Sequence, residues 1–173
     1  MSVLAITPEM GKNEVFDQVE RFLIDSGFGI HSKDSERPWG GFFVLEEDDI
    51  RKFKDMFFSS VVLTEDQFKQ KLSPKFLLVS PNARLSWQYH FRRSELWTLV
   101  AGNGSISRSL TNEQALPVSL EIGKVVILEQ GERHRLIGNS NWGIVAEIWV
   151  HTDPDQPSDE SDIVRLQDDY SRN

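Results

Sequence analysis

The chain has 173 residues and a formal net charge of −8, with 39% hydrophobic and 27% charged residues. This length suits one domain with a substantial core. An acidic chain without a basic stripe argues against a nucleic-acid-binding protein, and the lack of cysteine excludes disulfides and thiolate metal sites. No apolar run reaches the length of a membrane span, and residues 1–8 lack the features of a signal peptide, so we expect a cytoplasmic protein without a membrane partner.

The N-terminal part predicts one helix, at residues 8–26. Apolar residues recur at helical spacing between positions 15 and 23, Pro8 suits a first turn after a Thr7 cap, and glycines follow at 27 and 29. We therefore assign residues 1–36 to a helix and lead-in that pack on the main domain, residues 37–173. Within this lead-in, residues 30–41 are expected to form a loop that exposes His31.

Most of the remaining chain alternates short apolar runs with turn signals, which is typical of an all-β sandwich or barrel. A short helix is expected at 49–58, and turns at 101–104 and 137–141. The predicted strands are residues 42–45, 75–79, 96–100, 105–110, 116–120, 125–128 and 142–150.

Metal-capable side chains concentrate between positions 81 and 97. Gln88 and His90 are two residues apart, so a strand directs both to the same face. Glu95 follows a short turn and can reach the same pocket, and His134 offers a fourth donor further along the chain. Oxygen and nitrogen ligands of this mix predict one divalent ion, zinc first, with manganese, iron, cobalt or nickel as alternatives.

The same residues carry a resemblance to a known family. The runs 85–90 and 93–97, together with 37–40, 131–136 and 162–165, are similar to the motifs of type II phosphomannose isomerases, which are cupins. Tyr170 and Arg172 extend the likeness to the end of the chain. The chain also resembles short cupins labelled phosphoheptose isomerases.

This resemblance implies the fold and the reaction. The fold would be a mainly β cupin, a double-stranded β-helix or jelly-roll barrel, with an N-terminal helix and a short helical insertion. Residues 159–170 would be an ordered segment that folds over the barrel mouth. The activity would be aldose–ketose isomerisation of a small sugar phosphate, with mannose 6-phosphate and fructose 6-phosphate as the best pair, in a homodimer.

The chain departs from the family pattern at two positions. Arg92 stands where the motif often has a histidine, and Leu96 stands where a histidine often follows the glutamate. Neither position belongs to the ligand set of Gln88, His90 and Glu95 with His134. Both could change the pocket, so they leave the sugar undecided.

Basic residues near the ligands predict phosphate binding, because arginine can hold a phosphate through paired hydrogen bonds. Arg93 and Arg135 flank the ligands and match family positions. The resemblance also places Arg37 and Trp39 in the pocket wall. The full set of predicted substrate-binding residues is Arg93, Lys75, Arg37, Trp39 and Arg165.

Glu147 is the candidate catalytic base, and Arg135 is the second candidate catalytic residue. Glu147 lies between apolar residues on the strand 142–150, where burial would raise its pKa towards a value useful for proton transfer. Alternatively, Glu147 orients a histidine ligand. Glu132 is a weaker candidate base.

Other functions stay open. The chain would then act on another sugar, such as a heptose phosphate or lyxose, or bind a sugar phosphate without turnover. A cupin dioxygenase is disfavoured, because those enzymes favour a histidine-rich metal shell and this chain has Gln88 at the first ligand position.

Overall fold

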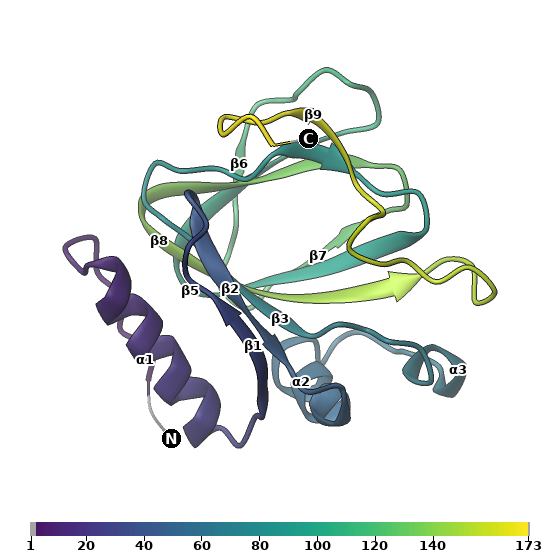
Figure 1. Ribbon diagram of the computed structural model, residues 1–173, viewed down its shortest axis with the longest axis horizontal. Coiled ribbons are helices and arrows are strands. Elements are labelled where there is room, and N and C mark those ends of the chain that lie inside the picture. The colour runs from purple at the N-terminus through teal and green to yellow at the C-terminus, as the bar shows by residue number, and fades with distance from the viewer. Residues whose placement is uncertain (1–2, 173) are drawn as a thin grey trace.

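The barrel is organised around one long strand, β8 (Arg133–His151). In the computed structural model, which describes residues 3–172, β8 pairs antiparallel with β5 (Arg93–Ser109) along almost its entire length. On its other edge β8 pairs with β3 (Lys75–Val79) and, near its start, with β4 (Trp87–Tyr89). Because three strands share β8, the sheet curls into a barrel (Figure 1).

Shorter strands extend this sheet. β1 (Ile30–Asp34) and β2 (Gly40–Leu45) continue it beyond β3, and β9 (Val164–Gln167) pairs with β4. β6 (Val118–Ser119) and β7 (Val125–Leu128) pair with β5. These pairings are all antiparallel, as expected for a jelly-roll barrel.

Helices cover the outer side of the barrel beside β1, β2 and β3 (Figure 1). They are α1 (Lys12–Asp25), the 3-10 turn η1 (Glu47–Asp49), α2 (Ile50–Phe57) and α3 (Glu65–Phe68). Their aromatic residues pack on the sheet, with the rings of Phe16 and Phe43 centred 5.5 Å apart.

Alternation along the strands gives the barrel wall an outer face under the helices and an inner face that carries both apolar and charged residues. On β8, Ile144 and Ile148 belong to the cluster beneath the helices, whereas Val145 belongs to a second cluster. Glu147 shares the inward face with Val145 and lines a cavity. The same alternation on β3 and β5 places Lys75 and Glu95 in that cavity.

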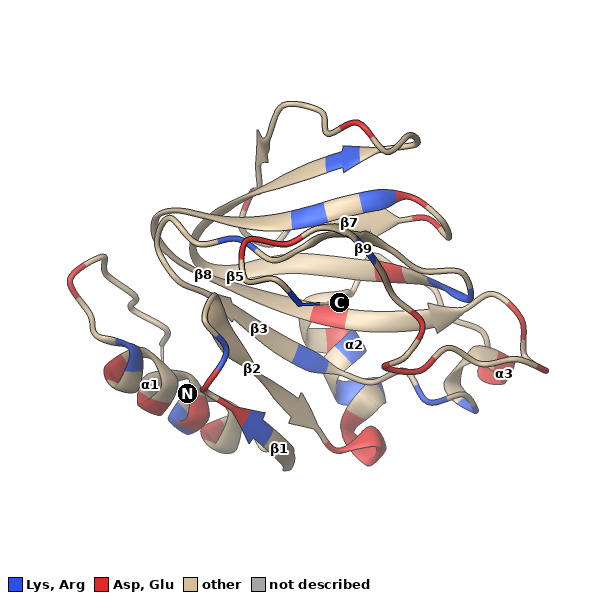
Figure 2. Ribbon diagram, turned by 45° about the horizontal axis from the view of Figure 1, so that its top comes forward, with Lys and Arg blue, Asp and Glu red and all other residues tan. Residues whose placement is uncertain are grey.

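Basic and acidic residues are interspersed along the ribbon (Figure 2). Between residues 3 and 172, no helix is long and apolar enough to cross a membrane. The first two residues of the predicted lead-in 1–36, and the last residue of 37–173, lie outside the described residues.

The helix predicted at 8–26 forms, but its start is wrong. α1 begins at Lys12 with Gly11 as its N-cap, and the amide of Met10 donates to the carbonyl of Thr7 at 3.2 Å in a separate turn. The glycines at 27 and 29 do follow its end. Thr7 and Pro8 belong to this separate turn and do not cap the helix, because a Thr-Pro pair suits an isolated turn as well as a helix start.

The loop predicted at 30–41 is also wrong in part, because β1 occupies its first half and pairs with β2. The strands expected at 75–79 and 125–128 are confirmed, as is the short helix α2. The C-terminal segment is ordered and contributes β9, as the resemblance implied.

Both predicted turns, at 101–104 and 137–141, are wrong, because β5 and β8 continue through these residues. The glycines there instead allow another segment of backbone to approach closely. Gly102 has a φ of +73°, and a Cβ atom on it would lie 1.7 Å from the carbonyl oxygen of Trp142. The ladder shifts register at this point, so the Gly-Asn-Gly sequence encodes a β-bulge in a long bent strand.

Candidate metal centre and cavity

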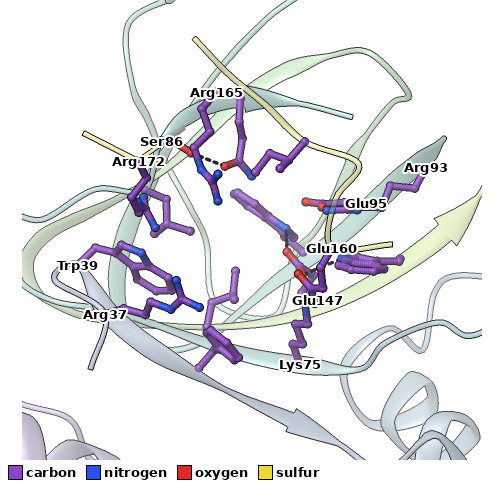
Figure 3. Close-up of a pocket in the computed structure, with 17 residues that line it drawn as sticks. Arg37, Trp39, Lys75, Ser86, Arg93, Glu95, Glu147, Glu160, Arg165 and Arg172 are labelled. Carbon is purple, nitrogen blue, oxygen red and sulfur yellow. Dashed lines mark hydrogen bonds and ion pairs between the residues drawn. The ribbon is translucent and has the colours of Figure 1, made fainter. Parts of the chain in front are cut away.

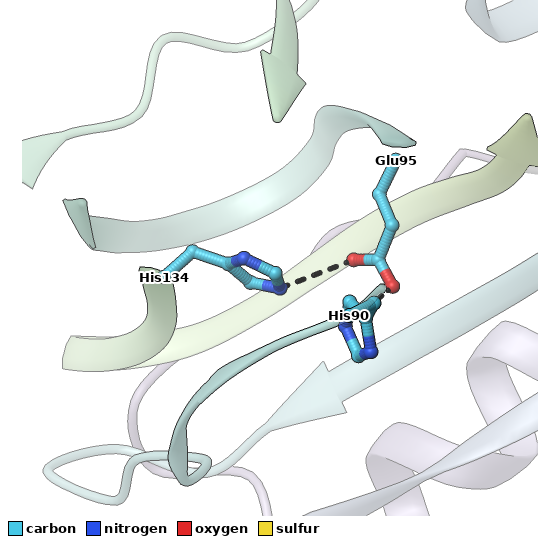
Figure 4. Close-up of side chains that lie close together, drawn as sticks. All are labelled: His90, Glu95 and His134. Carbon is cyan, nitrogen blue, oxygen red and sulfur yellow. Dashed lines mark ion pairs between the residues drawn. The ribbon is translucent and has the colours of Figure 1, made fainter. Parts of the chain in front are cut away.

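Three predicted ligands meet inside the barrel. His90 follows β4, Glu95 lies on β5 and His134 lies on β8, and one potential ligand atom of each lies within 4.8 Å of the others (Figure 4). The Nε2 atom of His90 is 3.1 Å from Oε1 of Glu95, and Nε2 of His134 is 3.4 Å from Oε2. All three side chains are buried.

Main-chain carbonyls fix the tautomers of both histidines. Nδ1 of His90 is 2.7 Å from the carbonyl oxygen of Asp162, and Nδ1 of His134 is 2.9 Å from that of Glu132. A carbonyl oxygen only accepts, so each Nδ1 carries the proton and donates it. In the neutral imidazoles, Nε2 therefore directs a lone pair at Glu95, which is how histidine ligands are held in metal sites.

The charge distribution suits a cation. Burial acts to raise the pKa of Glu95, but the positive charges of His90 and Arg93 outweigh it and hold that pKa well below its usual range. Burial acts to lower the pKa of His134, but its contact with Glu95 outweighs burial and raises that pKa. The buried carboxylate of Glu95 thus favours a positive charge at this position.

These residues fit a divalent metal ion. Within residues 3–172, Oε2 of Glu95 and Nε2 of His134 are buried atoms without a hydrogen-bond partner. An unsatisfied buried carboxylate oxygen facing an unsatisfied imidazole nitrogen is costly, and a metal bound to both would remove that cost. The two histidines and the carboxylate suit zinc, manganese or iron.

Gln88, the fourth predicted ligand, lies beside this cluster. It pairs across the sheet with His134 and lines the cavity. Its Oε1 atom accepts a hydrogen bond from the Ser86 hydroxyl at 2.5 Å. The structure thus brings Gln88 to the site and gives its amide oxygen a partner there.

The cluster opens onto a cavity of about 140 Å³ at the barrel mouth. Figure 3 shows Glu95 and Glu147 towards one side of this cavity, and Arg37 and Arg172 across from them. The lining residues that carry charge are Arg37, Lys75, Arg93, Glu95, Glu147, Glu160, Arg165 and Arg172. The cavity therefore has an acidic side and a basic side.

Glu147 reaches the cavity as predicted, and two indoles hold it. Nε1 of Trp97 donates to its Oε2 at 2.9 Å, and Nε1 of Trp149 donates to its Oε1 at 3.1 Å. Burial, together with the negative charge of Glu95, raises the pKa of Glu147 to about 7. A carboxylate with this pKa can both take up and release a proton near neutral pH.

Arg93 and Lys75 line the cavity, but other groups already bind them. Nε of Arg93 donates to Glu95 at 3.0 Å and its NH1 donates to the Ser158 hydroxyl at 2.8 Å. Nζ of Lys75 donates to Glu160 at 2.9 Å. Both cations therefore sit among carboxylates on the acidic side.

Arg37, Trp39 and Arg165 also line the cavity, as predicted. Arg135 does not, because His134 faces inward and its neighbour on a strand must face the other way. The Arg135 guanidinium is fully buried and donates to the carbonyls of Leu85 and Gln167 at 2.7 and 3.0 Å. Glu132, the weaker candidate base, is bound by Arg108 outside the cavity lining.

The two departures from the family pattern lie away from the cavity lining. Leu96 packs in the hydrophobic cluster beneath the helices, because its neighbours on β5 face inward. Arg92 donates to the carbonyl of Pro157 at 2.8 Å on the protein surface. Neither residue changes the chemistry of the cavity wall.

Sequence analysis assigned no role to several residues of the site. Trp97 and Trp149 were not recognised as partners of Glu147, although the period of two along a strand puts Trp149 on its face. Arg172 appeared only as part of a motif, yet it lines the cavity. The carboxylate of Asp162 accepts from the amides of Phe91 and Arg92 and so holds the turn after His90.

Comparison with known structures shows the fold. CapF in complex with an inhibitor matches at a TM-score of 0.51 and 16% identity, over 81% of this chain and 34% of CapF. Procruciferin from Brassica napus matches at 0.51 and 14%, over 78% and 29%. Vicilin from Solanum lycopersicum matches at 0.50 and 18%, over 73% and 32%. The chain spans about a third of each protein, and the shared architecture is the cupin barrel.

A search of curated protein sequences gave no match. The sequence model of the mannose-6-phosphate isomerase C-terminal domain matches residues 59–168, well over half of the chain. These residues include Glu95, Glu147 and both histidines of the candidate metal cluster. The chain therefore belongs to the family of mannose-6-phosphate isomerase C-terminal domains, on a cupin fold.

Proposed function

We propose that this protein is a metal-dependent sugar-phosphate isomerase that interconverts mannose 6-phosphate and fructose 6-phosphate. The observation that carries the proposal is the buried carboxylate of Glu147, whose pKa is raised to about 7, in the same cavity as Glu95 of the metal cluster. Isomerisation moves a proton between C1 and C2 of the sugar, which requires a base beside a group that stabilises an enediolate. Family membership supports the same reaction class.

The cluster of His90, Glu95 and His134 would hold the metal, with Gln88 beside it. When bound, a divalent ion supplies Lewis-acid stabilisation of the negative charge that develops on the substrate oxygens. Arg93 keeps Glu95 in place through the 3.0 Å hydrogen bond to Oε1, which leaves Oε2 as the available ligand oxygen. The two Nδ1 hydrogen bonds keep the imidazoles oriented.

Glu147 would act as the base. Its carboxylate would take the proton from one carbon and return it to the neighbouring carbon, while a second proton passes from the hydroxyl oxygen to the carbonyl oxygen. The indoles of Trp97 and Trp149 hold both oxygens in place without supplying a positive charge. This environment keeps the carboxylate basic, in contrast to a salt bridge, which would lower its pKa.

Zinc as the metal, the homodimer and the cytoplasmic location are further proposals that belong to this function. So are the direct contacts of Arg37, Trp39, Lys75, Arg93 and Arg165 with substrate. A heptose phosphate is the second substrate to test, since the metal centre and the base would serve any aldose–ketose pair. Lyxose is a third, and it would need no phosphate-binding group.

The test is turnover of mannose 6-phosphate by metal-reconstituted protein, measured as fructose 6-phosphate formed. The double variant His90→Ala/His134→Ala is the control, and it should lose both bound metal and turnover. Wild-type protein with stoichiometric metal and no turnover would exclude mannose 6-phosphate as substrate. Turnover of a heptose phosphate would then replace it, and binding without turnover would identify a non-catalytic sugar-phosphate-binding cupin.

A further inference from the structure

One end of the cavity is lined by hydrogen-bond donors. Arg37 comes from the β1–β2 connection, Arg165 from β9 and Arg172 from the chain beyond β9. Trp39 joins them, and its Nε1 is a buried donor without a hydrogen-bond partner within residues 3–172. Guanidinium and indole N–H groups donate and do not accept, so this end fits a ligand group that only accepts.

We propose that this end, formed by Arg37, Trp39, Arg165 and Arg172, binds the phosphate of the sugar phosphate. The inference deepens the proposed function and rests on it. A phosphate monoester carries up to two negative charges and offers three acceptor oxygens, which match a set of guanidinium groups and one indole N–H.

The electrostatics of this end support an anionic ligand. Burial lowers the pKa of Arg165, and the neighbouring charges of Arg172 and Arg37 lower it further. The Arg165 guanidinium therefore lies close enough to Arg172 and Arg37 to be repelled by both. Asp34 and Asp168 offset part of this charge: Asp34 accepts from Nε of Arg37 at 2.8 Å, and Asp168 accepts from Nε and Nη2 of Arg172 at 2.8 and 2.9 Å. Neither aspartate lines the cavity, whereas Glu95 and Glu160, which hold Arg93 and Lys75, both do.

The acidic side of the cavity is a poor place for phosphate. Arg93 and Lys75 were both predicted to bind it, but Arg93 is held by Glu95 and Lys75 by Glu160. Glu147 lies between them and would repel a phosphate when ionised. Figure 3 shows Arg37 and Arg172 across the cavity from Glu95 and Glu147, so a phosphate bound there would avoid these carboxylates.

This placement sets the orientation of the substrate. With phosphate at the donor end, the sugar extends across the cavity and its far carbons reach Glu147 and Glu95. The cavity thus selects a sugar whose phosphate lies at the opposite end of the chain from the reacting carbons. A sugar 1-phosphate would place its charge beside the carboxylates.

The test measures binding to the metal-loaded full chain by calorimetry, so that it does not depend on turnover. The probes are mannose 6-phosphate, mannose 1-phosphate, mannose and inorganic phosphate. Wild-type protein should bind mannose 6-phosphate best. Arg37→Gln and Arg172→Gln should each weaken that binding about tenfold or more, because each removes a charge-assisted hydrogen-bonding group, with mannose binding unchanged.

Matched control variants distinguish the loss of a phosphate-binding charge from a change in the protein's structure. Arg51→Gln removes an arginine that pairs with Glu65 outside the cavity, and it should bind like the wild type. Arg172→Lys keeps the positive charge and should recover part of the affinity. Arg37 lies outside the C-terminal segment, so its variant reports on phosphate even if Arg172→Gln loosens that segment.

These measurements distinguish failure of the phosphate subsite from failure of the isomerase proposal. If Arg37→Gln and Arg172→Gln bind mannose 6-phosphate as tightly as the wild type, this subsite is wrong and the isomerase proposal stands. If wild-type protein binds inorganic phosphate through these arginines but turns over no sugar phosphate, the subsite stands and the isomerase proposal is wrong. Wild-type protein that binds neither phosphate nor sugar phosphate contradicts both.

Discussion

The imidazole of His90 donates a hydrogen bond to the main-chain carbonyl of Asp162 at 2.7 Å, across 72 residues of sequence. The carboxylate of Asp162 also accepts from the amides of Phe91 and Arg92, at 2.9 and 3.0 Å. A single residue of the C-terminal segment thus fixes the orientation of a candidate metal ligand and the turn that follows it. Such outer partners commonly determine how well a metal site binds.

Removing the Asp162 side chain should weaken metal binding. Asp162→Ala leaves the amides of Phe91 and Arg92 without their acceptor, so the turn and the carbonyl that holds His90 should move. We expect the metal affinity to fall by about 10- to 100-fold, measured by competition with a chromophoric chelator. Asp159→Ala, an exposed neighbour in the same segment, should bind metal normally; equal losses in both variants would contradict the role of Asp162.

Glu147→Gln should abolish proton transfer while leaving metal bound. We expect turnover to fall by about 10²- to 10⁴-fold, the usual contribution of a general base, with metal content unchanged. The amide nitrogen cannot accept from an indole, so one of the hydrogen bonds from Trp97 and Trp149 is lost and thermal stability must be checked. Glu121→Gln on the surface is the control, and a Glu147→Gln enzyme of normal turnover would exclude Glu147 as the base.

Stability of the metal-free protein should depend on pH through Glu147. Its folded-state pKa is about 7 against an ordinary value of 4.5, so the folded state holds a proton that the unfolded state has released between these values. The free energy of unfolding should therefore fall as pH rises from 4.5 to 7, by up to about 3 kcal/mol.

Comparison with Glu147→Gln isolates this effect, because other groups titrate in both proteins. The stability of the variant relative to the wild type should improve between pH 5 and pH 8, as followed by urea unfolding. A stability difference that stays constant over this range would mean that Glu147 does not titrate there.

In the metal-loaded enzyme, turnover should rise with pH as Glu147 ionises, with a midpoint at or below 7 because the metal offsets the charge of Glu95.

Gly102→Ala should destabilise the barrel strongly. The new Cβ would lie 1.7 Å from the carbonyl oxygen of Trp142, and the residue has a φ of +73°. Gly123→Ala is the matched control, since Gly123 has a φ of +81° with no atom within 4 Å of a Cβ. We expect a loss of about 1 kcal/mol for Gly123→Ala and at least about 3 kcal/mol for Gly102→Ala; equal losses would show that the bulge tolerates a side chain.

The candidate ligands were predictable because each is the kind of residue that a strand or turn presents directly. Gln88, His90, Glu95 and His134 were identified from residue type and spacing, and the structure gathers them in one place. Glu147 was identified because a carboxylate between apolar residues on a strand requires a partner. Its partners were not predicted, since only the pairing of β8 with β5 brings Trp97 opposite Glu147.

The wrong predictions share one physical origin: local sequence patterns do not reveal which distant strands pair in the fold. Gly102 and Gly138 suggested turns, but both allow a neighbouring carbonyl to approach a strand that continues. Arg135 matched a family position, but its direction is set by the inward face of His134. Arg93 does line the cavity, but its hydrogen bonds with Glu95 and Ser158 form only in the folded barrel and cannot be inferred from the sequence.

Because Asp162 orients His90, the order in which the ribosome makes these two residues also matters. At about 5–20 residues per second, the ribosome makes Asp162 roughly 4 to 14 seconds after His90. During that interval the carbonyl that orients His90 does not yet exist. We therefore expect the candidate metal centre to reach its full affinity only after the C-terminal segment has been made.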